Sequence, residues 1–144
     1  MILKTYQNEA NRLKKLVTEK ALHKDSSMSK QKMCKILGLT LMKLHLMFTR
    51  NFDMSYSDFI NNLRVIEAKK LLADPTHRDR KKVEIARLSG FGSLSQFNVM
   101  FKRISGMTPS EYSVFHRNFV ELTGENPPLS ETPELELLLK GLKD

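Results

Sequence analysis

Apolar residues recur at helical spacing through almost the whole chain, which places them along one face of successive α-helices. No stretch alternates apolar and polar residues for long enough to form a strand of a sheet. The first helix is expected from about residue 3 to residue 22, with Leu13, Leu16 and Val17 on one side and lysines elsewhere. The pattern therefore predicts an all-α fold.

Capping residues, glycines and prolines indicate where the later helices begin and end. The expected helices run over about residues 29–37, 41–50, 55–72, 83–89, 93–104 and 108–119, followed by a short helix opened by Thr132 and Pro133. Thr108, Pro109 and Glu111 occupy the cap, first and third positions of the helix at 108–119, an arrangement typical of a helix start. The last short helix carries a leucine stripe, made of Leu135, Leu138, Leu139 and Leu142.

Two segments of the chain repeat the same apolar pattern. Each copy has a small residue four positions before a glycine, namely Cys34 and Gly38 in the first copy and Ala86 and Gly90 in the second. After the glycine one extra residue enters the second copy, so the offset grows from 52 to 53 residues. Two helices that cross steeply need a small side chain at their closest approach, and glycine lets the chain reverse within a few residues. The repeat therefore predicts two helix-turn-helix units, each with a half-buried second helix.

Positive charge is concentrated ahead of the acidic C-terminal segment. Residues 1–117 hold 22 Lys and Arg against 10 Asp and Glu, residues 118–144 hold 2 against 6, and the whole chain has a net charge of +8. Because neutralised phosphates release condensed counterions, a basic body favours a polyanionic partner. Lysine-rich surfaces also keep proteins soluble, so the charge alone leaves both interpretations open.

Residues that carry chemistry are few and dispersed. The chain has one cysteine, Cys34, and the histidines lack the close pairing of zinc ligands; they are His23, His45, His77 and His116. We find no nucleophile beside a base and no phosphate-cradling glycine loop, so we expect no enzyme, no cofactor and no metal site. Cys34 is expected to be a buried packing residue. No secretory signal and no apolar run of about 18 residues are present, which predicts a cytoplasmic protein without a membrane partner.

The second copy of the repeat carries a recognisable signature. In order, it consists of Ile85-Ala86, Gly90-Phe91, Ser93, Phe97, Phe101-Lys102, Gly106 and Thr108-Pro109-Ser110-Glu111-Tyr112. The segment between the copies adds Phe59-Ile60-Asn61, Arg64, Ala68 and Leu71-Leu72. With these motifs the chain resembles the C-terminal DNA-binding domain of the AraC/XylS family of bacterial transcription regulators, over about residues 29–112.

The resemblance implies two homeodomain-like three-helix units on one long linker helix, which holds both units on one side of a duplex. The expected divisions are a first helix-turn-helix subdomain at 1–55, the linker helix at 56–73, a second subdomain at 74–119, and an acidic tail with a short helix at 120–144. The resemblance also implies sequence-specific binding of double-stranded DNA and regulation of transcription, with recognition helices in successive major grooves. RNA polymerase is a candidate second partner, and two reading helices in one chain are compatible with DNA binding as a monomer.

Carried over position by position, the resemblance implies a DNA-binding site of twelve residues. They are Met42, Lys43, His45, Leu46, Thr49 and Arg50 on the first reading helix, and Ser93, Leu94, Ser95, Asn98, Val99 and Lys102 on the second. Asn98 has the side chain for a bidentate contact to adenine, and His45 and Ser95 can donate or accept at several bases. The cations are suited to phosphates; they are Lys43, Arg50 and Lys102.

Apolar residues interrupt this reading surface. Leu46 and Val99 stand where family members often place arginine or another polar reader, and with Leu94 they are suited only to thymine methyl groups. Ser113 replaces a frequent basic residue and removes one phosphate contact. These departures weaken the case for guanine readout, and they leave two interpretations open, modest sequence specificity or recognition of DNA shape. They also leave an alternative open, a helical protein–protein interaction module without specific DNA readout, in which Met42, Leu46 and Val99 contact a protein.

Overall fold

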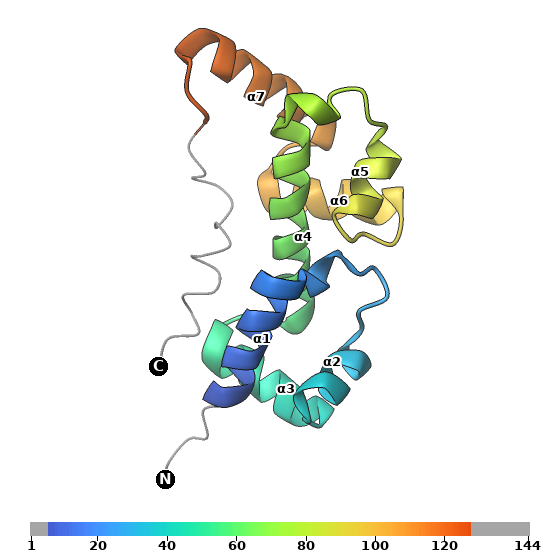
Figure 1. Cartoon of the computed structure of the whole chain (residues 1–144), viewed down its shortest axis with the longest axis vertical. Coiled ribbons are helices and arrows are strands. Elements are labelled where there is room, and N and C mark those ends of the chain that lie inside the picture. The colour runs from blue at the N-terminus through green and yellow to red at the C-terminus, as the bar shows by residue number, and fades with distance from the viewer. Residues whose placement is uncertain (1–5, 128–144) are drawn as a thin grey trace.

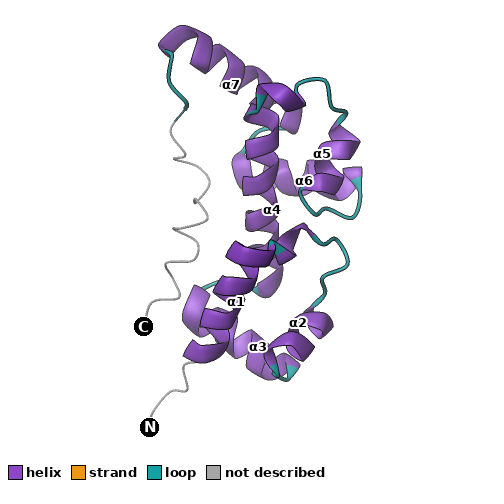
Figure 2. Ribbon diagram, viewed as in Figure 1, coloured by secondary structure: helices purple, strands orange, loops and turns teal. Residues whose placement is uncertain are grey.

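A computed structural model describes residues 6–127 of the chain. All regular elements of this part are helices joined by loops, and it contains no strand, as the apolar spacing predicts. The helices gather at the two ends of one long central helix, α4 (Tyr56–Ala73), as Figures 1 and 2 show. The short helix expected at Thr132 and Pro133 lies outside the described residues.

The remaining elements flank α4 in chain order. Before it come α1 (Gln7–Lys20), the 3-10 helix η1 (Leu22–Lys24), α2 (Lys30–Leu37), α3 (Leu41–Met47) and the π-helical turn η2 (Phe48–Phe52). After it come the 3-10 helix η3 (Pro75–His77), α5 (Lys82–Leu88), α6 (Leu94–Ser105) and α7 (Pro109–Thr123). Helix α7 is longer than expected, because it continues past residue 119 until Gly124 adopts the left-handed conformation.

Side-chain caps fix the helix starts, because the first N–H groups of a helix have no partner within it. The hydroxyls of Ser29, Thr40 and Ser55 accept hydrogen bonds from backbone N–H groups at 3.1–3.2 Å, at the starts of α2, α3 and α4. At α7, Thr108 Oγ1 accepts from the Glu111 N–H at 3.1 Å, and the Glu111 carboxylate accepts from the Thr108 N–H at 3.0 Å. This reciprocal pair is the capping box that the sequence predicts.

The first core lies among α1, α2, α3, η2 and the first half of α4. Its centre is aromatic, because Phe48 is fully buried with its ring centroid 4.9 Å from that of Phe52 and 5.3 Å from that of Phe59. Helix α4 contributes Tyr56, Phe59, Ile60 and Leu63 to this core.

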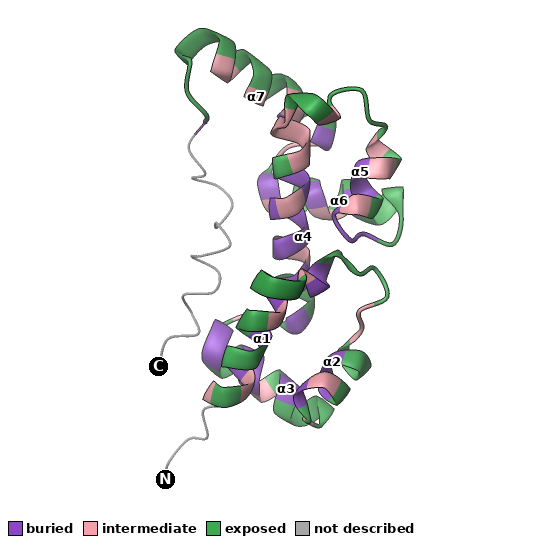
Figure 3. Ribbon diagram, in the orientation of Figure 1, coloured by how far each residue is buried: buried purple, intermediate pink, exposed green. Residues whose placement is uncertain are grey.

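The second core lies among the other half of α4, α5, α6 and α7. Phe97 is fully buried between Phe91 and Phe101, and Tyr112 of α7 closes the cluster against Phe101. Helix α4 contributes Val65 and Ala68. One helix is therefore buried along most of its length by two separate cores, as its colouring in Figure 3 shows.

Candidate nucleic-acid interface

The two copies of the repeat fold into the same local structure. In the first copy the N–H of Leu39 donates to the carbonyl of Cys34 at 2.9 Å, and in the second the N–H of Phe91 donates to the carbonyl of Ala86 at 2.9 Å. Cys34 and Ala86 are both buried, which confirms the packing interpretation of the cysteine. Each copy is a helix-turn-helix, formed by α2 and α3 in the first unit and by α5 and α6 in the second.

The second helix of each unit buries one face and exposes the other. Leu44 of α3 is 2% exposed and Phe97 of α6 is 0% exposed, so these two matched residues point into the two cores. On the opposite face Met42 is 67% exposed and Val99 is 58% exposed. A helix with one buried and one free face has the shape that major-groove reading requires.

Eleven of the twelve expected site residues are exposed. Nine of these eleven lie on or at the start of α3 and α6, whereas Thr49 and Arg50 lie in η2, because the expected helix at 41–50 ends at Met47 and continues as a π-helical turn. The exception is Leu46, which is half-buried and packs against the first core, so only part of its side chain is available to a partner. Ser93 is exposed but has a structural task, because its hydroxyl accepts a hydrogen bond from the Gln96 N–H at 3.1 Å and caps α6. Thr49 Oγ1 donates to the carbonyl of His45 at 3.0 Å.

Sequence reasoning missed Leu41, which is 52% exposed at the start of α3. The repeat contained the signal, because Leu41 stands 53 residues before Leu94, a residue that the expected site includes. Applying the same offset to the whole site gives four further matched pairs: Met42 with Ser95, His45 with Asn98, Leu46 with Val99, and Thr49 with Lys102. The two outer faces therefore share a framework and differ in the groups they present.

Cations surround the outer faces of both helices. Lys43 is exposed on α3 and Arg50 on the η2 turn that follows it, and Lys102 and Arg103 are exposed on α6. The nearby Glu111 carboxylate has its pKa lowered, first by the hydrogen bond from the Thr108 N–H and, to a smaller extent, by the charge of Lys102. Positive charge beside two exposed helix faces suits a phosphate-bearing partner.

Within residues 6–127, no group of three or more His, Cys, Asp or Glu side chains is arranged to hold a metal ion. None of the helices in the same range is long and apolar enough to cross a membrane.

Two helix-turn-helix units built on one shared helix define a tandem helix-turn-helix protein. Residues 33–114, more than half of the chain, match the helix-turn-helix domain family. The chain therefore belongs to the AraC/XylS type of helix-turn-helix regulators, the family that its signature motifs indicate.

Known relatives agree with this assignment. The HTH-type transcriptional activator RhaS of Enterobacter sp. (strain 638) is 28% identical over 105 residues, which cover 73% of this chain and 37% of RhaS. The probable transcriptional regulator LumQ of Photobacterium leiognathi is 26% identical over 95 residues, which cover 66% of this chain and 37% of LumQ. The chain thus spans little more than a third of the length of these two relatives.

A solved structure shows the same fold. It is the C-terminal domain of the two-component response regulator yesN from Fusobacterium nucleatum subsp. nucleatum, which is 29% identical with a TM-score of 0.63. The match covers 72% of this chain and 97% of that domain. The similarity therefore extends over the tandem unit as a whole.

Proposed function

We propose that this chain binds double-stranded DNA in a sequence-specific manner through α3 and α6, and so regulates transcription. The observation that carries the proposal is the matched exposure of two second helices, each with a buried core face and an outer face flanked by cations. Family membership and the names of the relatives support the regulatory role. RNA polymerase is the second partner that we propose, on the family relationship alone.

We propose further that the two helices enter successive major grooves of one duplex, about 34 Å apart, so that a single chain suffices for binding. The matched pairs also predict a property of the operator, the DNA sequence that the chain would bind. His45 and Asn98 occupy equivalent positions but offer different hydrogen-bonding groups, an imidazole and an amide. A two-fold symmetric operator would require equivalent readers, so the proposed operator has two unlike half-sites.

Exposed apolar side chains indicate part of what is read. Leu41 and Met42 on α3, and Leu94 and Val99 on α6, are all among the exposed large hydrophobic residues of the described chain. The thymine methyl is the apolar group that a base pair presents in the major groove. We therefore expect thymines in both half-sites. Their replacement by uracil, which keeps the hydrogen-bonding edge, should weaken binding about fourfold for each methyl that is contacted.

Fluorescence anisotropy with labelled duplex DNA tests the proposal directly. If about six phosphates are neutralised, a plot of the logarithm of affinity against the logarithm of salt concentration should have a slope near −5. A flat plot, or no binding of any duplex at micromolar protein and low salt, would refute DNA binding and favour the protein–protein interaction module.

Two substitutions on the same helix separate base reading from phosphate contact. Asn98→Ala should reduce the preference at one base position by about 1–3 kcal/mol, because an amide lost from a base edge affects only that base pair. Lys102→Ala should weaken binding to all sequences alike and make the salt slope shallower by about one. An equal loss on every sequence for both variants would contradict the reading role of Asn98.

A further inference from the structure

The two helix-turn-helix units touch each other directly, beside the helix that they share. The contact is between main chains: a Cβ atom built on Gly90, in the turn between α5 and α6, would collide with the carbonyl oxygen of His23 and lie 2.8 Å from Cα of Lys24. His23 and Lys24 belong to η1, which follows α1 in the first unit. The turn of the second unit thus rests on a loop of the first.

Arg64 of α4 stabilises this contact. Its Nε donates to the carbonyl of His23 at 2.8 Å, and its Nη2 donates to the carbonyl of Asp25 at 3.0 Å. The same Nε would lie 3.0 Å from a Cβ atom on Gly90. Arg64 is 6% exposed, and burial is the main reason why its pKa lies below the ordinary value. Arg64 of α4 therefore binds the first unit through two hydrogen bonds and lies beside the Gly90 turn of the second unit.

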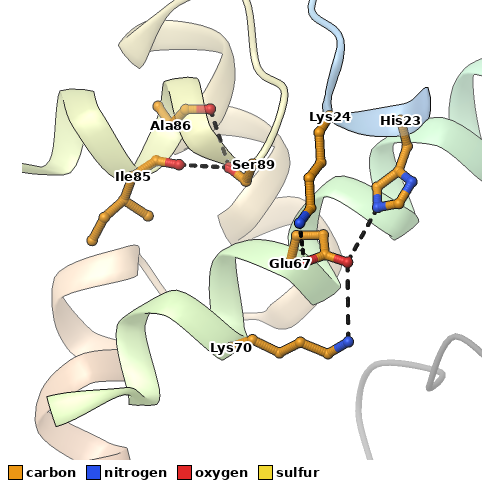
Figure 4. A network of polar contacts seen from close by, with 7 residues as sticks. All are labelled: His23, Lys24, Glu67, Lys70, Ile85, Ala86 and Ser89. Carbon is orange, nitrogen blue, oxygen red and sulfur yellow. Dashed lines mark hydrogen bonds and ion pairs between the residues drawn. The ribbon is translucent and has the colours of Figure 1, made fainter. Parts of the chain in front are cut away.

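Glu67, one helical turn further along α4, adds an ionic contact to the same loop (Figure 4). Its Oε1 lies 3.2 Å from Nε2 of the buried His23, and its Oε2 lies 3.5 Å from Nζ of Lys24. Lys70 approaches the carboxylate from the next turn, at 4.0 Å. The hydrogen bond with His23 is the largest cause of the lowered pKa of Glu67, and the two lysines lower it further. We call the group formed by His23, Lys24, Arg64, Glu67 and Gly90 the joint.

The place of the joint on α4 suggests its task. Leu63 belongs to the first core and Val65 to the second, so Arg64 stands where α4 passes from one unit to the other. Two units joined by a single helix can still rotate relative to each other about the axis of that helix. A second contact, away from this axis, prevents the rotation.

We propose that Arg64, Glu67 and Gly90 are positioning residues that fix α6 relative to α3 and so specify the number of base pairs between the two half-sites. This inference rests on the proposed function. Each added base pair moves a half-site by about 3.4 Å and turns it by about a tenth of a helical turn. A rigid protein meets such a shift only by deforming the DNA, which reduces affinity by about tenfold or more.

Selection from a pool of random duplexes, run in parallel for the full chain and its variants, tests the inference. The readout is the number of base pairs between the two enriched motifs. Arg64→Met and Glu67→Gln remove contacts of the joint. Arg12→Met is the matched control, because Arg12 Nη2 donates to the carbonyl of Ile36 at 2.7 Å within the first unit.

The wild-type chain and Arg12→Met should each select one spacing, and Arg64→Met should select two or more. On duplexes lengthened by one base pair, the wild type should lose about tenfold in affinity and Arg64→Met less than about threefold. Urea unfolding checks that each variant folds, and Glu67→Gln, which also removes a contact of the joint, carries the test if Arg64→Met does not fold.

Two results would count against these ideas, and they are distinguishable. One spacing shared by the wild type and every folded joint variant would overturn the positioning role while leaving DNA binding intact. Failure of the wild-type chain to enrich any sequence would instead refute the proposed function.

Discussion

Gly38 and Gly90 occupy the same place in the two turns, yet the structure requires glycine for different reasons. Both have a positive φ, 68° at Gly38 and 102° at Gly90. A Cβ atom on Gly38 would meet nothing within 4 Å, whereas one on Gly90 would collide with the main chain of His23 and Lys24. The first glycine serves only its own turn, and the second also permits the contact between units. The two glycines are therefore equivalent in the repeat, but only Gly90 also allows the contact between the two units.

The ends of the two reading helices differ in a similar way. Helix α6 ends at Gly106, whose φ is 80° and whose N–H donates to the carbonyl of Lys102 at 2.8 Å. At the matched position of the first unit stands Asp53, which holds a φ of 56° after the π-helical turn η2. A left-handed conformation costs an L residue energy that glycine avoids. The first unit therefore ends its reading helix less favourably than the second.

The largest effect is expected from placing alanine at the two turn glycines. Gly90→Ala should lower the free energy of unfolding by about 3 kcal/mol or more, because the methyl group meets main chain that cannot move aside cheaply. Gly38→Ala should cost about 1 kcal/mol, from its conformation alone. Urea unfolding of both variants measures the difference. Equal losses of unfolding free energy would mean that a methyl group at position 90 does not collide with the main chain of His23 and Lys24.

The sequence predicted the helices and the two turns because these depend on local signals. Caps such as Ser29 and Thr108 act within a few residues, and the buried faces of Leu44 and Phe97 follow from helical spacing. The exposure of the outer faces follows from the same periodicity.

The joint could not be predicted in this way. His23 and Glu67 are 44 residues apart and lie in segments without a shared pattern. The contact between Gly90 and the main chain of the first unit cannot be recognised from the sequence, because the turn requires glycine whether or not another segment packs against it. Arg64 was visible as part of the signature, but its partners are backbone carbonyls, which any sequence provides. The half-burial of Leu46 likewise depends on how closely α3 packs on the first core.

A smaller effect, of opposite sign, is expected at Asp53. Asp53→Gly should raise the free energy of unfolding by about 1 kcal/mol, because relief of the left-handed conformation outweighs the greater freedom of glycine in the unfolded chain. Gly106→Asp is the reciprocal change and should lower stability by a similar amount. The midpoint of urea unfolding measures both. If Asp53→Gly destabilises the chain, the two helix ends are not equivalent and the comparison between them fails.

A still smaller effect on stability is expected from Glu67→Gln, and its signature is a dependence on pH. The pKa of Glu67 is lowered from its ordinary value of 4.5, so its charge stabilises the folded chain above that pH and the benefit is lost as the pH falls through the folded-state pKa. Glutamine retains an oxygen that accepts a hydrogen bond but loses the charge. At neutral pH the variant should therefore be less stable by about 0.5 kcal/mol, and in acid the difference should disappear.

Glu84→Gln supplies the comparison for Glu67→Gln, because Glu84 pairs with Arg80 at 3.2 Å within the second unit, on a more exposed surface. Its loss should change stability by less than about 0.5 kcal/mol, since an exposed pair is screened by water. The two variants differ further in what they do to the spacing of selected half-sites, which only Glu67→Gln should broaden. A difference between wild type and Glu67→Gln that stays constant from neutral to acid pH would show that the carboxylate charge does not hold the two units together.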